Sequence, residues 1–123
     1  MAAPRRSFLL IPLLLARFAA AAAVGVLGFT FNGVSNRFIT PNGDGRNDNV
    51  AFRFSNPSDS AGTVKIYDLR GHLLTTISIN SGTGAVSAVW DARANGQIVP
   101  TGVYIYVIAV EGVVASGALV VVR

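Results

Sequence analysis

The segment from Trp90 to Val110 constrains the fold of this chain more than any other. It predicts the end of one strand, a long polar turn, and then a strand over residues 103–110 whose side chains alternate between two faces. One face would carry Val103, Ile105, Val107 and Ala109, and the other Tyr104, Tyr106, Ile108 and Val110. Because both sets are apolar or aromatic, neither face is expected to be fully solvated. This pattern is typical of a central strand in a small β-sandwich.

Other segments alternate in the same way and are separated by turn residues. Predicted strands cover residues 30–39, 49–54, 63–69, 73–79, 85–90 and 113–122, the first of them broken at Asn32-Gly33. Val86, Ala88 and Trp90 are expected to share one face, with Trp90 as the largest side chain of the core. Six or seven short strands, with no room for crossover helices, predict an all-β fold, an antiparallel β-sandwich of about seven strands.

The N-terminus has the three parts of a secretory signal peptide. Arg5 and Arg6 supply positive charge, residues 8–15 are almost entirely aliphatic, and residues 19–23 are alanines. We expect a hydrophobic signal helix over residues 1–23, a linker or first strand over 24–37, and the β-sandwich over 38–123. The alternative is a retained membrane anchor over residues 8–31, but Arg17 at its centre would cost about 2.5 to 3.5 kcal/mol. The prediction is therefore a secreted or cell-surface protein that meets the membrane only through its leader.

Charge and cysteine content exclude several classes of function. The chain has ten basic and six acidic residues, and removal of the leader would leave seven basic residues. These are scattered, without the basic run or interleaved aromatics of a nucleic-acid-binding surface, so no nucleic-acid partner is expected. The chain has no cysteine. Thiolate catalysis, a Cys-ligated zinc ion and a redox motif are thereby excluded.

His72 is the one histidine of the chain and follows the turn signal Arg70-Gly71. A hydrolytic triad would need it to be oriented by Asp68 and to face a serine on a strand-to-helix elbow, and no G-x-S-x-G sequence is present. An exposed turn histidine is the better interpretation. No catalytic residues are predicted, and we expect the protein not to be an enzyme.

One loop carries a candidate ligand set. Calcium prefers oxygen ligands at alternate positions of a glycine-containing loop, and Asn42, Asp44 and Asp48 could supply three side chains. The twelfth-position glutamate of an EF-hand is missing, and Arg46 adds a positive charge. The competing interpretation is a tight turn that its own side chains stabilise by hydrogen bonds. Calcium is the one candidate cofactor, and both alternatives remain open at this point.

Several motifs together resemble bacterial Ig-like C-terminal modules. Residues 64–73 (VKIYDLRGHL) are similar to their "V-x-I-Y-D-x-x-G-x-x-V" hairpin, and residues 38–48 (FITPNGDGRND) to the opening "I-T-P-N-G-D-G-x-N-D". Residues that fit the segment "W-D-G-x-x-x-x-G-x-x-x-P-x-G-x-Y-x-Y" are Trp90, Asp91, Gly96, Pro100, Gly102, Tyr104 and Tyr106. The apolar ending 119–123, closed by Arg123, is similar to their last strand. Such modules occur in flagellar hook-capping proteins and as type IX secretion sorting domains, including the gliding-motility-associated kind.

The residues that fit the W-D-G…Y-x-Y segment can be given a structural role from turn chemistry alone. Asp91 can accept hydrogen bonds from the following loop amides as in an Asx-turn, and Asn95-Gly96 can supply positive backbone φ angles. Pro100 and Gly102 would end the loop and let the next strand enter the sheet. We therefore expect these residues to shape the fold rather than to carry chemistry.

The resemblance implies an Ig-like fold and three functional hypotheses. The first is an exported, non-enzymatic structural or attachment module that binds protein partners or self-assembles at the cell surface. The second is a type IX sorting domain, with the final strand and Arg123 presented to the secretion machinery. The third is an accessory domain that binds calcium or carbohydrate through residues 42–48. Sorting modules of this kind normally end a much larger cargo protein, whereas here only a leader and a short segment precede the module, which favours the first hypothesis.

Overall fold

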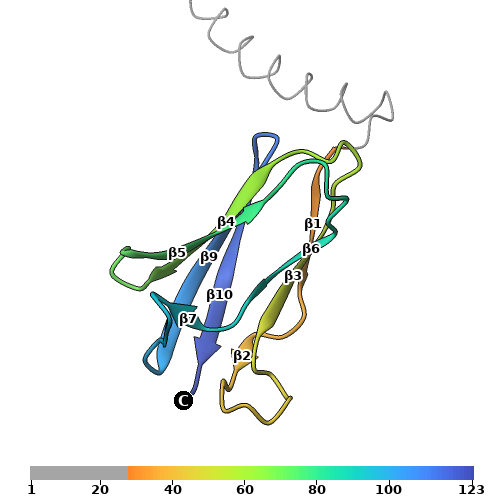
Figure 1. Ribbon diagram of the computed structural model, residues 1–123. Helices are drawn as coiled ribbons and strands as arrows, with labels where there is room; N and C mark the ends of the chain where they lie inside the picture. The colour runs from red at the N-terminus through yellow and green to blue at the C-terminus, as the bar shows by residue number, and fades with distance from the viewer. Residues whose placement is uncertain (1–27) are drawn as a thin grey trace, which may run out of the picture.

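The computed structural model describes residues 28–123 (Figure 1), so the predicted signal peptide over residues 1–23 lies outside the described part. Between residues 28 and 123 the secondary structure consists of strands, and no helix is long and apolar enough to span a membrane. The strands are β1 (Thr30–Val34), β2 (Phe38–Ile39), β3 (Val50–Ser55), β4 (Gly62–Asp68), β5 (Leu73–Ile79), β6 (Ser87–Trp90), β7 (Arg93–Ala94), β8 (Gln97–Ile98), β9 (Gly102–Val110) and β10 (Val113–Val121). The predicted all-β fold is confirmed.

Two sheets pack face to face as a sandwich (Figure 1). One has three strands in the order β1-β3-β6, and the other has five in the order β2-β10-β9-β4-β5. A two-stranded hairpin, β7-β8, lies between β6 and β9 in the chain. β9 pairs with β10 and β4, so the strand predicted from residues 103–110 is central, as expected.

The inner faces of the two sheets form the core. On β9 the buried side chains are Tyr104, Tyr106, Ile108 and Val110, while the alternate set is only half-buried or exposed. Phe52 of β3 is fully buried, and its ring lies 5.1 Å from that of Tyr106, centroid to centroid. Trp90 is 2% exposed, as expected of the largest core side chain. The prediction that residues 103–110 form a central strand, made from apolar side chains on both faces, is therefore correct.

The first predicted strand is divided between the two sheets. β1 pairs antiparallel with β3, and the register shifts between Phe31 and Gly33, where Gly33 has a φ of 104°. β2 then pairs parallel with β10, through Val120–Phe38 and Val121–Ile39. The predicted antiparallel sandwich thus contains one parallel pair, formed where the chain crosses from one sheet to the other between β1 and β2.

Val86 does not share the buried face of Ala88 and Trp90; the prediction was wrong, since its side chain is 66% exposed. β6 begins only at Ser87. The Val86 carbonyl still accepts a hydrogen bond from the amide of Phe54 (3.0 Å), while the loop before it is fixed by Asp59, whose carboxylate accepts hydrogen bonds from the amides of Gly82 (2.7 Å) and Gly84 (3.2 Å). The alternation therefore does not extend back to residue 86.

Candidate functional site

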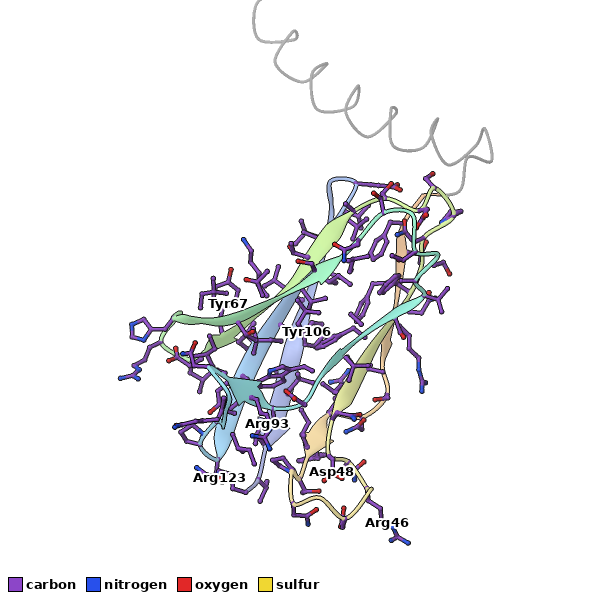
Figure 2. All side chains as sticks on the ribbon, viewed as in Figure 1. Arg46, Asp48, Tyr67, Arg93, Tyr106 and Arg123 are labelled. Carbon is purple, nitrogen blue, oxygen red and sulfur yellow. The ribbon has the colours of Figure 1, made fainter. Side chains whose placement is uncertain are left out.

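Three segments that the sequence singled out lie at one end of the sandwich (Figure 2). Arg46 and Asp48 of the loop over residues 42–48, Arg93 of the β7–β8 hairpin and the terminal Arg123 all lie toward this end. A shallow depression of about 190 Å³ lies between that loop and the hairpin, with Asp48, Asp91 and Arg93 among its lining residues. We call this region the C-terminal end of the sandwich.

The loop over residues 42–48 is closed by its own side chains. The two carboxylate oxygens of Asp48 accept hydrogen bonds from the amides of Gly43 (2.9 Å) and Gly45 (2.7 Å). Asn42 Oδ1 accepts from the amide of Asp44 (3.1 Å), and Asp44 Oδ1 accepts from the amide of Arg46 (2.8 Å). The contacts of Asn42 and Asp44 are Asx-turn contacts, and Asp48 closes the loop by binding amides that precede it. A turn stabilised by its own side chains is what the sequence offered as the alternative to a metal site.

The same geometry bears on the calcium hypothesis. Asn42, Asp44 and Asp48 lie in one loop, but their oxygens are turned toward backbone amides rather than toward a shared point. Within residues 28–123, no three His, Cys, Asp or Glu side chains converge in a way that could hold a metal ion. Calcium binding at this loop stays a prediction.

The hairpin that follows Trp90 is held by backbone and side-chain contacts together. The Trp90 indole N–H donates to the carbonyl of Arg93 (2.9 Å), and Asp91 Oδ1 accepts from the amide of Arg93 (3.2 Å). Asn95 and Gly96 have φ angles of 54° and 80°, which a tight two-residue turn requires. The segment predicted to be a polar turn therefore contains the short strands β7 and β8.

Tyr104 joins this hairpin to the core. Its hydroxyl donates to the carbonyl of Pro100 (2.6 Å), and its ring lies 5.9 Å from that of Trp90 in an edge-to-face arrangement. Burial raises the pKa of the Tyr104 hydroxyl. Neutral at physiological pH, this hydroxyl is a hydrogen-bond donor that fixes the turn before β9, which is a structural role.

The last strand ends between two elements that are distant in sequence. The amides of Val120 and Val122 donate to the carbonyls of Arg37 (2.8 Å) and Ile39 (2.9 Å). The amide of Arg123 donates to Thr101 Oγ1 (2.9 Å), whereas its side chain is exposed. The final residues are thus fixed through their backbone, and the Arg123 guanidinium is presented to solvent.

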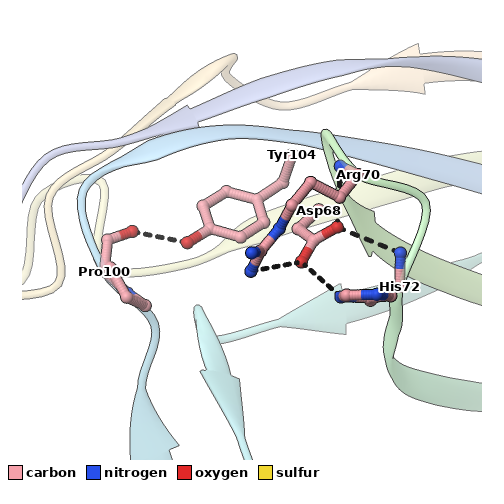
Figure 3. A network of polar contacts seen from close by, with 5 residues as sticks. All are labelled: Asp68, Arg70, His72, Pro100 and Tyr104. Atoms are coloured by element: carbon pink, nitrogen blue, oxygen red, sulfur yellow. Dashed lines mark hydrogen bonds and ion pairs between the residues drawn. The ribbon is translucent and has the colours of Figure 1, made fainter.

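A second polar network lies at the β4–β5 turn (Figure 3). Asp68 Oδ1 accepts from the amides of Arg70 (2.9 Å) and His72 (3.0 Å), and His72 Nδ1 lies 3.4 Å from Asp68 Oδ2. A groove of about 450 Å³ separates this turn from the β7–β8 hairpin and Tyr104. His72 is exposed, and the Asp68 carboxylate accepts hydrogen bonds from the turn amides. The Asp68–His72 pair therefore stabilises the β4–β5 turn. The sequence marked the turn but not this use of Asp68.

The Asp68 network predicts an acid-sensitive contribution to stability. Hydrogen bonding from the His72 amide, with further help from the Arg70 amide and nearby positive charge, lowers the pKa of Asp68 in the folded state. A lowered pKa means that its contribution is present above the unfolded pKa of about 3.8 and is lost as the pH falls through the folded value. We expect the difference in urea midpoint between the native chain and Asp68→Asn to shrink toward zero below about pH 4. A difference that stays constant from pH 7 to pH 2 would contradict this.

Comparisons with known proteins agree with this architecture. The family model described as the CHU_C type IX secretion signal domain matches residues 32–119. Among solved structures, the crystal structure of dimeric latent PorU from Porphyromonas gingivalis is similar over 80% of this chain, with 20% sequence identity and a TM-score of 0.54. This chain spans 10% of the length of that PorU chain, so the likeness concerns the fold. No curated protein matches the chain.

Proposed function

Because the chain belongs to the CHU_C type IX secretion signal domain family, we propose that it presents the C-terminal end of its sandwich to the type IX secretion machinery. It is an Ig-like module of a secretion-signal family, which agrees with both the module and the sorting hypotheses of the sequence. Export to the cell surface or medium, after removal of the leader over residues 1–23, is part of the proposal. We also propose that the protein is not an enzyme. In support, the carboxylate beside its one histidine, Asp68, accepts hydrogen bonds from turn amides.

The observation that carries the proposal is the exposure of Arg123 on a fixed backbone. Its amide is anchored to Thr101, and the strand before it is held by β9 on one side and by β2 on the other. A charged side chain that projects from a fixed backbone and makes no ion pair among the described residues keeps its charge available to a partner. The neighbouring Val122 is 44% exposed and adds apolar surface.

The test must separate export from folding. Deletion of residues 119–123 would remove Leu119 and Val121, both fully buried, so loss of export after that deletion would not distinguish the two. Arg123→Glu changes one exposed side chain and leaves the amide contact to Thr101 in place. We expect this variant to fold normally and to be retained in cells that carry the type IX machinery, with at least a several-fold drop in the exported fraction.

A matched control is Arg53→Glu, which reverses another exposed arginine, on the outer face of β3. Exported and retained protein would be measured by quantitative immunoblotting, and folding by the melting temperature of the purified variants. Normal export of Arg123→Glu, or equal losses for the two variants, would contradict a role for the C-terminal end.

A further inference from the structure

The outward face of the five-stranded sheet is mostly apolar along β2, β10 and β9, whereas its β4 and β5 part is polar. Along β10 and its neighbours the register places Phe38 beside Val120 and Val120 beside Val103. The same side of β9 continues with Ile105 and Val107. Val114 lies on this side of β10 near the start of the strand, with Ser116 and Ala118 between it and Val120. Phe38 and Val114 are 62% and 65% exposed, and the others are half-buried or just exposed. We call these six side chains, Phe38, Val103, Ile105, Val107, Val114 and Val120, the outer apolar face.

The opposite side of the sandwich shows that this is not a general property of the fold. The exposed side chains of the three-stranded sheet are mostly polar or charged: Thr30, Asn32, Arg53, Ser55, Ser87 and Val89. An antiparallel sheet with one solvated face normally alternates apolar inside and polar outside, as this sheet does. The β2, β10 and β9 part of the five-stranded sheet departs from that rule, with Ser116 as the one polar residue among its outward positions. Exposed apolar surface of this kind marks an interaction site.

Charge is almost absent from the outer apolar face. Among the outward positions of its described strands, Lys65 of β4 is the one charged residue. Lys65 pairs with Val107 on one side and with Thr76 of the edge strand β5 on the other. It therefore lies directly beside Val107, where a long side chain can keep its ammonium group in water while its methylenes cover apolar surface. Two such faces can meet without burying like charges.

The size of the face fits a weak, specific contact. β9 and β10 have nine residues each. At roughly 3.3 Å per residue and 4.8 Å between strands, the face measures about 30 Å by 15–20 Å. Two copies would bury on the order of 1,000 Å² in total, which is below the usual range of stable interfaces and typical of weak, transient ones. We therefore expect association in the micromolar range, as for other small, transient interfaces.

We propose that the outer apolar face is an interface between two copies of this chain, packed sheet against sheet. Facing sheets pack about 10 Å apart at a small angle, the same geometry that forms the interior of the sandwich. A second copy suits the face because it brings an equally uncharged surface, so each apolar side chain meets another. This proposal goes beyond the role in export, which concerns Arg123 and the C-terminal end.

The test is sedimentation equilibrium of the chain as cells process it, over about 1–200 µM. We expect the native chain to dimerise with a dissociation constant of roughly 10–100 µM. Val107→Lys, near the centre of the face, should weaken the dimer at least about ten-fold. Because Val107 is half-buried, a second variant guards against misfolding: Val114→Lys alters a side chain that is already 65% exposed and should weaken the dimer with the melting temperature unchanged.

The matched control is Val89→Lys, the same substitution on the outer side of β6, where Val89 is 51% exposed. This variant should dimerise like the native chain. A native chain that is monomeric at 200 µM would overturn the proposal, as would equal weakening by Val89→Lys. If the native chain is monomeric and Val114→Lys is retained in cells, the face contacts the secretion machinery instead, and self-association is overturned. Export by Arg123 is tested independently of these outcomes.

Discussion

Replacing Gly117 with alanine is expected to lower the free energy of unfolding by about 2–3 kcal/mol, because the added methyl group has no room. Gly117 of β10 lies opposite Tyr106 of β9. A Cβ atom there would lie 2.6 Å from Cζ and 2.7 Å from Cε2 of the Tyr106 ring, and closer still to its hydroxyl. Tyr106 cannot move away easily, since its ring packs against Phe31 and Phe52 in the core. The absence of a side chain at position 117 is thus what lets a tyrosine fill this part of the core.

The control is Gly102→Ala, on the strand paired with β10. There the nearest side-chain atom to an added Cβ, Tyr104 Cε2, is 3.9 Å away, and the backbone φ is not positive. We expect a change within about 0.5 kcal/mol. Tyr106→Phe removes the atom closest to the new methyl group, so it should recover part of the loss when combined with Gly117→Ala. Urea unfolding of the native chain, the two single variants Gly117→Ala and Tyr106→Phe, and their combination gives the double-mutant cycle. A neutral Gly117→Ala would show that the sheets can separate locally at no cost.

The fold was predictable from the sequence wherever a strand has a two-residue period along its own length. Val50, Phe52 and Phe54 of β3 are buried as their alternation indicates, and β5 occupies the predicted residues 73–79. The parallel pairing of β2 with β10 was not predictable, because it joins residues about eighty positions apart and leaves no local pattern. Two-residue strands such as β7 and β8 are likewise too short to show a period.

The candidate site was predictable as separate motifs but not as one place. The loop at residues 42–48, the turn after Trp90 and the ending at Arg123 each have turn or strand chemistry of their own. Their gathering at one end depends on how the two sheets are ordered. Asp59 was missed altogether: its carboxylate holds Gly82 and Gly84, more than twenty residues away. A lone aspartate in a polar loop carries no signal for such a contact.

Apolar residues on both faces of residues 103–110 led to the prediction of a central strand, and this was correct. The structure shows that the two faces of β9 are apolar for different reasons. Tyr104, Tyr106, Ile108 and Val110 are apolar or aromatic because they fill the core. Val103, Ile105 and Val107 face outward on a sheet that no other element of the described chain covers. The place of β9 between β10 and β4 makes it a central strand. It does not explain why the side chains on the outward face of β9 are apolar.

Replacing Trp90 with alanine is expected to cost about 3–5 kcal/mol, the usual range for deleting a large aromatic side chain from a core. Trp90 is 2% exposed, packs edge-to-face on Tyr104, and pairs across the sheet with Val50. Because a domain of this size is stabilised by only about 5–15 kcal/mol, Trp90→Ala should lose a large fraction of that stability and melt at least about 12 °C below the native chain. Far-UV circular dichroism during thermal unfolding would measure this, since the variant lacks the one tryptophan of the chain.

Two companion variants separate packing from hydrogen bonding at this position. Trp90→Phe keeps most of the buried ring but removes the indole N–H that donates to the carbonyl of Arg93. Its cost should be smaller, about 1–3 kcal/mol, and should appear chiefly as faster local opening of the β7–β8 hairpin in amide hydrogen exchange. Val89→Ala, at the adjacent exposed position, should change stability by less than about 0.5 kcal/mol. If Trp90→Phe were as damaging as Trp90→Ala, the hydrogen bond to Arg93 rather than core packing would be the main contribution of Trp90, and the hairpin would depend on it for folding.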